Sequence, residues 1–237
     1  MIFNNIIHNI VHDYFITGTL KKINDDYHTV IPSSYYYASP LMEVNFPNCT
    51  SIGNSAFQGC TSLTSINFPN CNYIRNYAFY NCRSLISINF PSCTSIGENA
   101  FWNCSKLTSV SFPNCIYLGL YAFHSCSYIT SINFPNCTSI APSAFAGCYR
   151  LSSASFPKCV KIYSYAFKNC YNLLSLYLLG SSIPSLNNIN AFQSTPISDY
   201  TTSTGGVYGS IYVPASLYNS YLVASVWSTL SSRIVSV

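Results

Sequence analysis

The chain has 237 residues, of which 49% are hydrophobic, 16% aromatic and only 7% charged. An average soluble domain carries about 25% charged residues, so Ser, Thr, Asn and Tyr must supply most of the polar surface here. The formal net charge of +4 comes from ten basic residues spread along the chain, and Lys21-Lys22 is the only adjacent basic pair. Nucleic-acid-binding proteins cluster Lys and Arg on one face, so this composition argues against a nucleic-acid partner.

The sequence shows no targeting or membrane-spanning segment. No stretch approaches the roughly 20 apolar residues of a transmembrane helix, so we expect no membrane span. The start, MIFNNIIHNIVHDYFITG, lacks the basic region and the small-residue cleavage site of a signal peptide. The chain is therefore intracellular, part of a virus particle, or cut from a longer exported protein, and the sequence does not choose among these.

Residues 1–27 are predicted to cap the N-terminal end of the fold. Ile2, Ile6 and Ile10 lie near helical spacing. His8 and His12 could share a helix face as metal ligands with Asp13, but three ligands without a fourth partner more often mark an ordinary surface. We therefore predict no metal site and no cofactor.

Two short phrases recur along residues 28–178 with a step of 22 residues. FPNC or a near variant begins at Phe46 and at each 22nd residue up to position 156, and Ala-Phe-x-x-Cys begins at Ala56 and recurs up to position 166. A fixed period of this length is typical of a solenoid, whose units bury their apolar faces by stacking on one another. Subtracting 22 from Ile52 and Cys60 makes VIPSSYYYASPL a degenerate first repeat, with Val30 and Ala38 in their places.

Each repeat contains one clear strand signal. Ile66 and Phe68 alternate with Ser65 and Asn67, which predicts a short strand with one buried face, and Pro69 then ends the ladder. About eight such coils would stack about 4.8 Å apart. A polar column on the strand face is one candidate binding surface, although a plain solvated sheet with side-chain ladders is the simpler interpretation. This column contains Asn67, Asn89, Ser111, Asn133, Ser155 and Tyr177.

Aligned on Leu63, the repeats are L-x-x-I-x-F-x-x-C followed by I-G-x-x-A-F-x-x-C. The first half resembles the leucine-rich-repeat core L-x-x-L-x-L-x-x-N/C. The second half resembles the BspA-like (Treponema pallidum-type) leucine-rich repeats of bacterial surface proteins and some protists. This resemblance implies a leucine-rich-repeat solenoid with a parallel β-sheet on its concave face and short helical or 3-10 turns opposite. It also implies an adhesin-like role at a cell surface.

The twelve cysteines all fall on one frame with a step of 11 residues. They lack the C-x2-4-C spacing of zinc sites. Disulfides between like cysteines of adjacent coils remain conceivable at about 4.8 Å, but we favour two columns of buried, inert thiols that pack as small hydrophobes. The predicted structural thiols are Cys49, Cys60, Cys71, Cys82, Cys93, Cys104, Cys115, Cys126, Cys137, Cys148, Cys159 and Cys170.

Aromatic residues replace charged ones at the variable positions around Ala-Phe-x-x-Cys. Tyr80, Trp102 and His124 lie 22 residues apart and are predicted to form one exposed ridge. Rigid aromatic anchors among Ser, Asn and Gly are typical of binding surfaces. The alternative is that these side chains only cover the coil edges with their polar ends in water. Further flanking aromatics are Tyr73, Tyr77, Tyr117, Tyr121, Tyr128, Tyr149, Tyr163, Tyr165 and Tyr171.

Residues 179–237 are predicted to form a last irregular coil and a C-terminal cap. The 22-residue period breaks, because Ala191-Phe192 follows Ala166-Phe167 by 25 residues. SIYVP at 210–214 repeats the pattern of SINFP and predicts another strand. The spacing of Leu217, Tyr221 and Trp227 predicts an amphipathic helix, and SRIVSV predicts a final strand. This ending resembles the Val-Pro-x-x-Leu segment found after such repeats in gut Firmicutes proteins.

The sequence offers little for catalysis. It contains six acidic residues and four histidines, and no two of them are placed as the acid and base of a catalytic pair. An enzyme with an appended repeat would need its catalytic groups in 187–237, which holds one acid and no histidine. We therefore predict a non-enzymatic protein that binds a protein or glycan through its rigid repeat surface. The alternative is a structural or display module of a phage tail or cell-envelope assembly.

Overall fold

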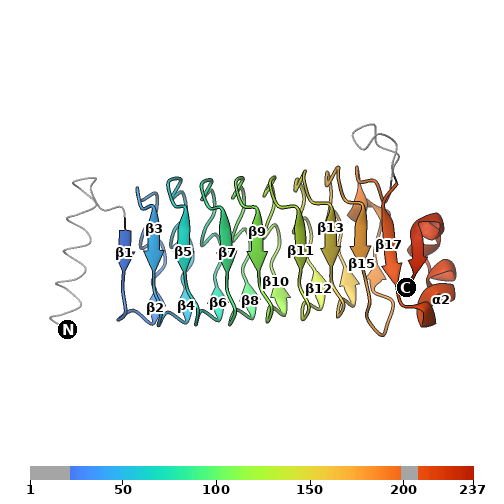
Figure 1. The fold of residues 1–237 in the computed structure, drawn as a ribbon, viewed down its shortest axis with the longest axis horizontal. Helices are drawn as coiled ribbons and strands as arrows, with labels where there is room; N and C mark the ends of the chain where they lie inside the picture. Colours follow the sequence, from blue (N-terminus) through green and yellow to red (C-terminus); the bar gives the residue numbers. More distant parts are fainter. Residues whose placement is uncertain (1–21, 199–207) are drawn as a thin grey trace.

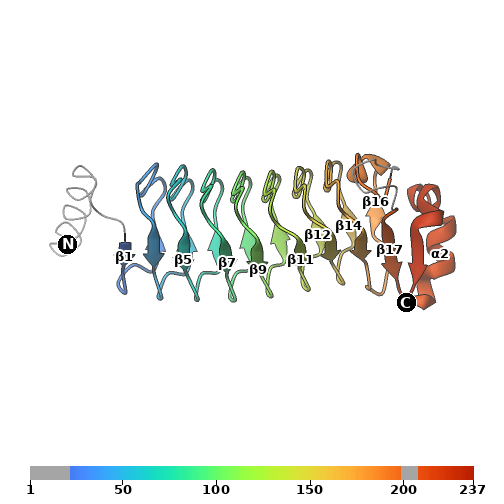
Figure 2. The same ribbon diagram turned by 45° about the horizontal axis from the view of Figure 1, so that its top comes forward.

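The computed structural model describes residues 22–198 and 208–237. Nine coils, each with a strand on the first face, stack in a nearly straight row from β1 to β17 (Figure 1). Figure 2 shows a second set of strands behind the first and the C-terminal helical segment covering the last coil. The predicted leucine-rich-repeat solenoid with a step of about 22 residues and a short C-terminal helix is therefore confirmed.

The strands of the first face are short and parallel, and their central residues point into the core. Ile23, Val44 and Ile66 lie in register across β1, β3 and β5, while the polar residues on either side of each face outward. The strands are β1 Lys22–Asn24, β3 Glu43–Asn45, β5 Ser65–Asn67, β7 Ser87–Asn89, β9 Ser109–Ser111, β11 Ser131–Asn133, β13 Ser153–Ser155, β15 Ser175–Tyr177 and β17 Ser210–Val213.

A second set of two-residue strands lines the opposite side of the coils. These strands are also parallel, with Ile52 and Ile74 in register across β4 and β6. They are β2 Val30–Ile31, β4 Ser51–Ile52, β6 Tyr73–Ile74, β8 Ser95–Ile96, β10 Tyr117–Leu118, β12 Ser139–Ile140, β14 Lys161–Ile162 and β16 Ser185–Leu186.

The turn that contains Ala-Phe-x-x-Cys follows each short strand, and its amides alternate between two kinds of acceptor. The Gln58 amide donates to the Ser55 carbonyl at 3.1 Å, a 3-10-type bond, whereas the Phe57 amide donates across to Ala78 of the next coil at 2.8 Å. Because every second amide points at the neighbouring coil, the turn does not continue into a helix. Among the described residues, a 3-10 helix takes this place in the last coil, at η1 Ile189–Phe192.

The first described coil is one residue shorter than the predicted period. Ile31, not Val30, pairs with Ile52. Ser39, not Ala38, takes the place of Cys60, because its amide donates to Tyr36 at 3.1 Å as that of Cys60 donates to Phe57. The assignment by subtracting 22 was therefore wrong for these two positions. One residue is missing just before buried Leu41, a change that the surrounding turn absorbs without disturbing the register of the strands.

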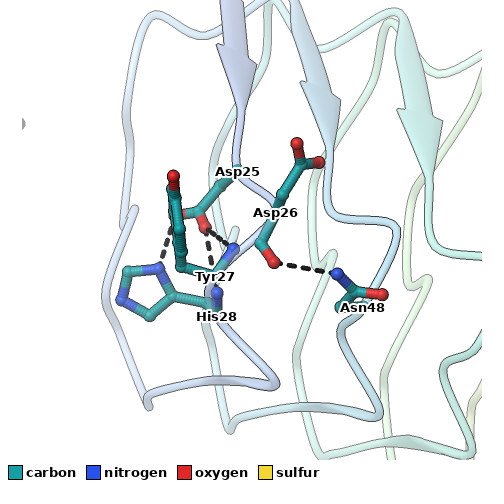
Figure 3. Close-up of polar contacts among 5 residues, drawn as sticks. All are labelled: Asp25, Asp26, Tyr27, His28 and Asn48. Carbon is teal, nitrogen blue, oxygen red and sulfur yellow. Dashed lines mark hydrogen bonds and ion pairs between the residues drawn. The ribbon is translucent and has the colours of Figure 1, made fainter.

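Asp25 and His28 close the N-terminal end of this described coil (Figure 3). The register of β1 and β3 places Asp25 beside Phe46, so the sequence DDYH stands where later coils have FPNC. The Asp25 carboxylate accepts hydrogen bonds from the Tyr27 and His28 amides at 2.8 and 2.9 Å and pairs with the His28 imidazole. Burial opposes ionisation of Asp25, but these hydrogen bonds together outweigh it and lower its pKa.

Removing this carboxylate should loosen the first described coil without unfolding the rest. We expect Asp25→Ala to cost about 1–3 kcal/mol locally, because two partly buried amides and the imidazole lose their acceptor. Hydrogen exchange of the Tyr27 and His28 amides should accelerate, and exchange of the coils from β7 onward should not. Asp26→Ala is the matched control because the Asp26 side chain is exposed. Equal exchange in the two variants would contradict the capping role.

The C-terminal end is covered by three short helical pieces rather than one helix. They are η3 Ala215–Leu217, α2 Tyr218–Val223 and η4 Val226–Arg233, and the break between the last two comes at Ala224, whose backbone is extended. Tyr221 and Trp227 are buried against the last coil, and the indole Nε1 donates to the Pro184 carbonyl at 2.7 Å. The predicted final strand is confirmed as β18 Ile234–Ser236, parallel to β17.

The core consists mainly of two interleaved columns of phenylalanine rings. Phe79 and Phe101, from the turns, stack at 5.2 Å, and Phe90 and Phe112, from the FPNC phrases, stack at 5.4 Å. The columns meet edge to face, as at Phe101 and Phe112 with 5.9 Å between ring centroids. Each coil is therefore held by rings of the coils before and after it, so no single coil has a complete core of its own.

Candidate binding surface

The structure brings the three residues of the predicted aromatic ridge into one continuous stack. The Tyr80 and Trp102 ring centroids lie 6.0 Å apart with an interplanar angle of 26°, and those of Trp102 and His124 lie 4.0 Å apart at 10°. Tyr77 packs beside Tyr80 at 5.8 Å, and Tyr121 packs against Trp102 at 5.2 Å. All five side chains keep part of their surface in water. The aromatic ridge is therefore a half-buried platform of aligned ring edges.

The tyrosines beside the aromatic ridge occupy an unfavourable backbone conformation. Tyr77, Tyr121 and Tyr165 have φ of 59°, 55° and 61°, in the left-handed region, while the coils between them place Asn99 and Ser143 at the same turn position. Asn tolerates this region and bulky residues do not. The three tyrosines therefore cost backbone energy that a small polar residue would avoid, and such positions cluster at functional sites.

His124 is held as a neutral ring at the end of the stack. Burial lowers its pKa, and a hydrogen bond of 2.8 Å joins its Nδ1 to the Ser125 hydroxyl. A neutral imidazole loses less solvation than an imidazolium when it packs face to face on Trp102. The imidazole therefore continues the aromatic surface at neutral pH instead of adding a charge to it.

The predicted polar column lies on the outer side of the first face, spread over several strands. Asn67 donates to the Asn45 side chain at 2.7 Å, and Asn133, Ser155 and Tyr177 lie in register on β11, β13 and β15. Such side-chain ladders satisfy part of the hydrogen-bonding capacity of the column without a ligand. Its binding role stays a prediction.

A broader depression of about 640 Å³ lies over the FPNC turns. Its polar groups are largely engaged already, because Asn114 and Asn136 donate at 2.8 Å to the carbonyls of Pro91 and Pro113 in the preceding coils. Lys158 donates to the Asn136 side chain at 2.7 Å. These residues hold neighbouring coils together, which makes the depression a weaker candidate for ligand binding.

All twelve thiols are buried and free in the structure. The thiols of one column donate hydrogen bonds to backbone carbonyls of neighbouring coils, as Cys82 does to Phe57 at 3.0 Å. The thiols of the other column donate to the carbonyl two residues ahead in the chain, as Cys71 does to Tyr73 at 3.4 Å. Burial raises the pKa of these thiols, in the case of Cys137 to about 11, which keeps them protonated and unreactive at neutral pH.

Neither a metal site nor a membrane span is found in the part of the chain that the structure describes. No group of three His, Cys, Asp or Glu residues there could hold a metal ion. Among the same residues, no helix combines the length and the apolar character needed to cross a membrane. The potential ligands His8, His12 and Asp13 lie outside the described residues.

These features define a leucine-rich-repeat solenoid, a class of proteins that generally serve as interaction modules and are typically not enzymes. The family model described as "BspA type Leucine rich repeat region" matches residues 29–152 and 94–206, with six copies. The chain belongs to this family. No match was found among curated proteins.

Two solved structures show the same architecture. A leucine-rich repeat protein from Bacteroides ovatus is 29% identical, with a TM-score of 0.56 over 68% of this chain and 41% of its own. The chain thus spans less than half of that protein. The T. pallidum leucine-rich repeat protein is also 29% identical, with a TM-score of 0.57 over 61% of this chain and 71% of its own.

Proposed function

We propose that the chain is a non-enzymatic recognition module that binds a protein or glycan partner, in the manner of an adhesin, through the aromatic ridge. The observation that carries the proposal is the continuous stack of Tyr80, Trp102 and His124 along one edge of a rigid solenoid. Large rings held in place by neighbouring coils offer contact area at little cost in side-chain entropy on binding.

The backbone at the aromatic ridge supports the same proposal. Tyr77 and Tyr121 sit in the left-handed region, where Asn or Gly would fold more easily. A residue that lowers stability at an exposed edge needs another reason to be there, and contact with a partner supplies one. The bound partner would lie across several coils, since the ridge runs along the solenoid axis.

Replacing the aromatic ridge should abolish binding and leave the fold in place. We expect a variant carrying Tyr80→Ser, Trp102→Ser and His124→Ser to bind at least about tenfold more weakly, because interface aromatics typically contribute about 2 kcal/mol or more. The experiment immobilises the purified chain and measures saturable binding to host matrix proteins, mucins and a glycan panel. Circular dichroism should show the parent spectrum and a cooperative thermal transition.

A second triple variant, Asn67→Ser, Asn89→Ser and Asn133→Ser, is the matched control on the strand face. It should bind like the parent chain, because its positions lie on the polar column. Loss of binding in this control alone would move the site to the strand face. If the parent chain binds none of the probes, the structural or display role becomes the better explanation.

A further inference from the structure

A hollow of about 460 Å³ lies at the His124 end of the aromatic ridge, over the next coil. Its floor is the turn of a single coil, formed by Ser143, Ala146 and Gly147, and Ala146 stands where the other Ala-Phe-x-x-Cys turns carry a larger side chain. Ala146 lies in register with His124, because the turns repeat every 22 residues. Its small side chain is 4% exposed. The hollow thus exists because Ala146 interrupts a row of larger side chains, with small Ser143 and Gly147 on the same turn.

The walls of the hollow come from the coils on either side. Tyr121 and His124 form the first wall, and Tyr165 and Lys168 form the second. Both tyrosines are in the left-handed backbone region described above, with φ of 55° and 61°. On the second wall the Lys168 ammonium lies over the Tyr165 ring, 5.0 Å from its centroid.

The space between the walls has the width of one missing ring. Successive rings of the aromatic ridge are 6.0 and 4.0 Å apart, and His124 and Lys168 are separated by two coils, or roughly 10 Å at the usual strand spacing. One flat ring placed over Ala146 would therefore contact His124 on one face, as Trp102 does on the other. The lining is mostly polar, with phenol, hydroxyl and amide groups around the ring faces.

The charge of this part of the chain favours an anion. Residues 99–198 contain five Lys and Arg residues and no Asp or Glu. Lys168 is the cation that lines the hollow. A carboxylate near its ammonium would form a charge-assisted hydrogen bond, and no acidic side chain in that stretch competes for it.

We propose that the hollow binds the ring of an acidic sugar, with the ring seated on His124 in place of the missing aromatic side chain and its carboxylate at Lys168. The inference rests on the proposed recognition function and names a ligand class for it. A sugar fits better than an aromatic side chain because its hydroxyl groups can pair with the Tyr, Ser and Asn groups of the lining. Its polarised C–H groups suit the negative face of an aromatic ring.

The test compares sialyllactose with lactose, two probes that differ by the acidic sugar. Calorimetry or ligand-observed NMR on the full chain should show saturable binding of sialyllactose and at least about tenfold weaker binding of lactose, the ratio expected for one charge-assisted hydrogen bond. Glucuronic acid and glucose provide a second matched pair. Absence of binding to both acidic probes would overturn the proposal.

Filling the hollow is the most direct variant. Ala146→Tyr places in this coil the residue that the turn already carries at Tyr80, so the fold should tolerate it and the ring should occupy the sugar position. We expect at least about a tenfold loss of sialyllactose affinity, while Ala146→Ser, which leaves the hollow open, should bind like the parent. Lys168→Gln should bring sialyllactose down to the affinity of lactose. Unchanged sialyllactose binding in Ala146→Tyr would overturn the proposal even if Ala146→Ser failed to fold.

The outcomes separate this inference from the broader proposal. If the parent chain binds a matrix protein or glycan, and the ridge variant loses that binding while Ala146→Tyr retains it, the aromatic ridge is the site and the hollow is not. If the ridge variant binds like the parent, the proposed function itself fails. If the parent chain binds peptides with exposed Trp or Tyr more tightly than both acidic sugars, the sugar proposal is contradicted and the ligand is a protein.

Discussion

Raising the pH through about 9 should unfold the whole solenoid in one cooperative transition. All twelve thiols are buried, and burial raises the pKa of thiols in both columns, to about 11 in Cys137 and about 12 in Cys60 and Cys93. The unfolded chain releases these protons near pH 8.5–9, whereas the folded chain keeps them. The stabilisation is therefore fully present below the unfolded pKa and is lost as pH rises toward the folded pKa.

The expected effect is large because the thiols act together. Each thiol that ionises only in the unfolded state contributes ~1.4 kcal/mol per pH unit to unfolding. Twelve of them reach on the order of 16 kcal/mol per pH unit, which exceeds the 5–15 kcal/mol stability of a typical domain.

The measurement is circular dichroism in reducing buffer, stepped from neutral pH to about pH 10.5 and back. Urea unfolding at each pH should show a falling midpoint with an unchanged slope, since the surface exposed on unfolding stays the same. Brief iodoacetamide labelling with mass spectrometry should find molecules with either no label or all twelve. Stepwise labelling of a chain that keeps its spectrum, or a stable fold beyond pH 10.5, would show that the thiols are not buried together.

Phe101→Ala should be among the most damaging single substitutions in the core. The Phe101 ring is fully buried, stacks on Phe79 and Phe123 at 5.2 and 5.1 Å, and meets Phe90 and Phe112 edge to face. Removing such a ring leaves a cavity that costs about 3–5 kcal/mol, and the lost ring pairs place this case at the upper end. Because coils are stabilised by their neighbours, the chain should also lose cooperativity around the gap.

The measurement is urea unfolding of the Phe101→Ala variant, and the control is the same substitution at another position of the column. Phe192 is equally buried but has ring contacts with Phe167 and Trp227, at 6.0 and 6.3 Å. Phe192→Ala should therefore cost less than Phe101→Ala, and Phe101→Leu should cost about 1.5 kcal/mol or less because volume is largely kept. Equal losses in Phe101→Ala and Phe192→Ala, or a loss below about 1.5 kcal/mol in Phe101→Ala, would contradict the interleaved-column account.

The regular part of the fold could be predicted from the sequence because the same residue pattern recurs in every coil. The alternation of Ser65, Ile66 and Asn67 predicts the strand, and the 22-residue step then fixes which residues lie in register. The step also placed Tyr80, Trp102 and His124 beside one another, which the stacking distances bear out. Their role in binding was inferred from residue type alone and remains a proposal.

The prediction failed where the chain departs from the repeat. Without the structure, the missing residue before Leu41 could not be located, so the first coil was shifted by one. The contacts of Asp25 with Tyr27 and His28 were also missed, although a 21-residue step would have set DDYH against FPNC. The small residues of SAFAG were visible in the sequence and mark the floor of the hollow over Ala146. They indicate a hollow only together with the two walls that the neighbouring coils supply.

The sequence alone therefore determined the solenoid, its period and its buried columns, because these follow from contacts between positions a fixed number of residues apart. The tertiary structure decided how the coils end and where the edge is hollowed. Those features depend on side chains from three consecutive coils and on which backbone amides point between coils, and neither is visible in the pattern of a single repeat.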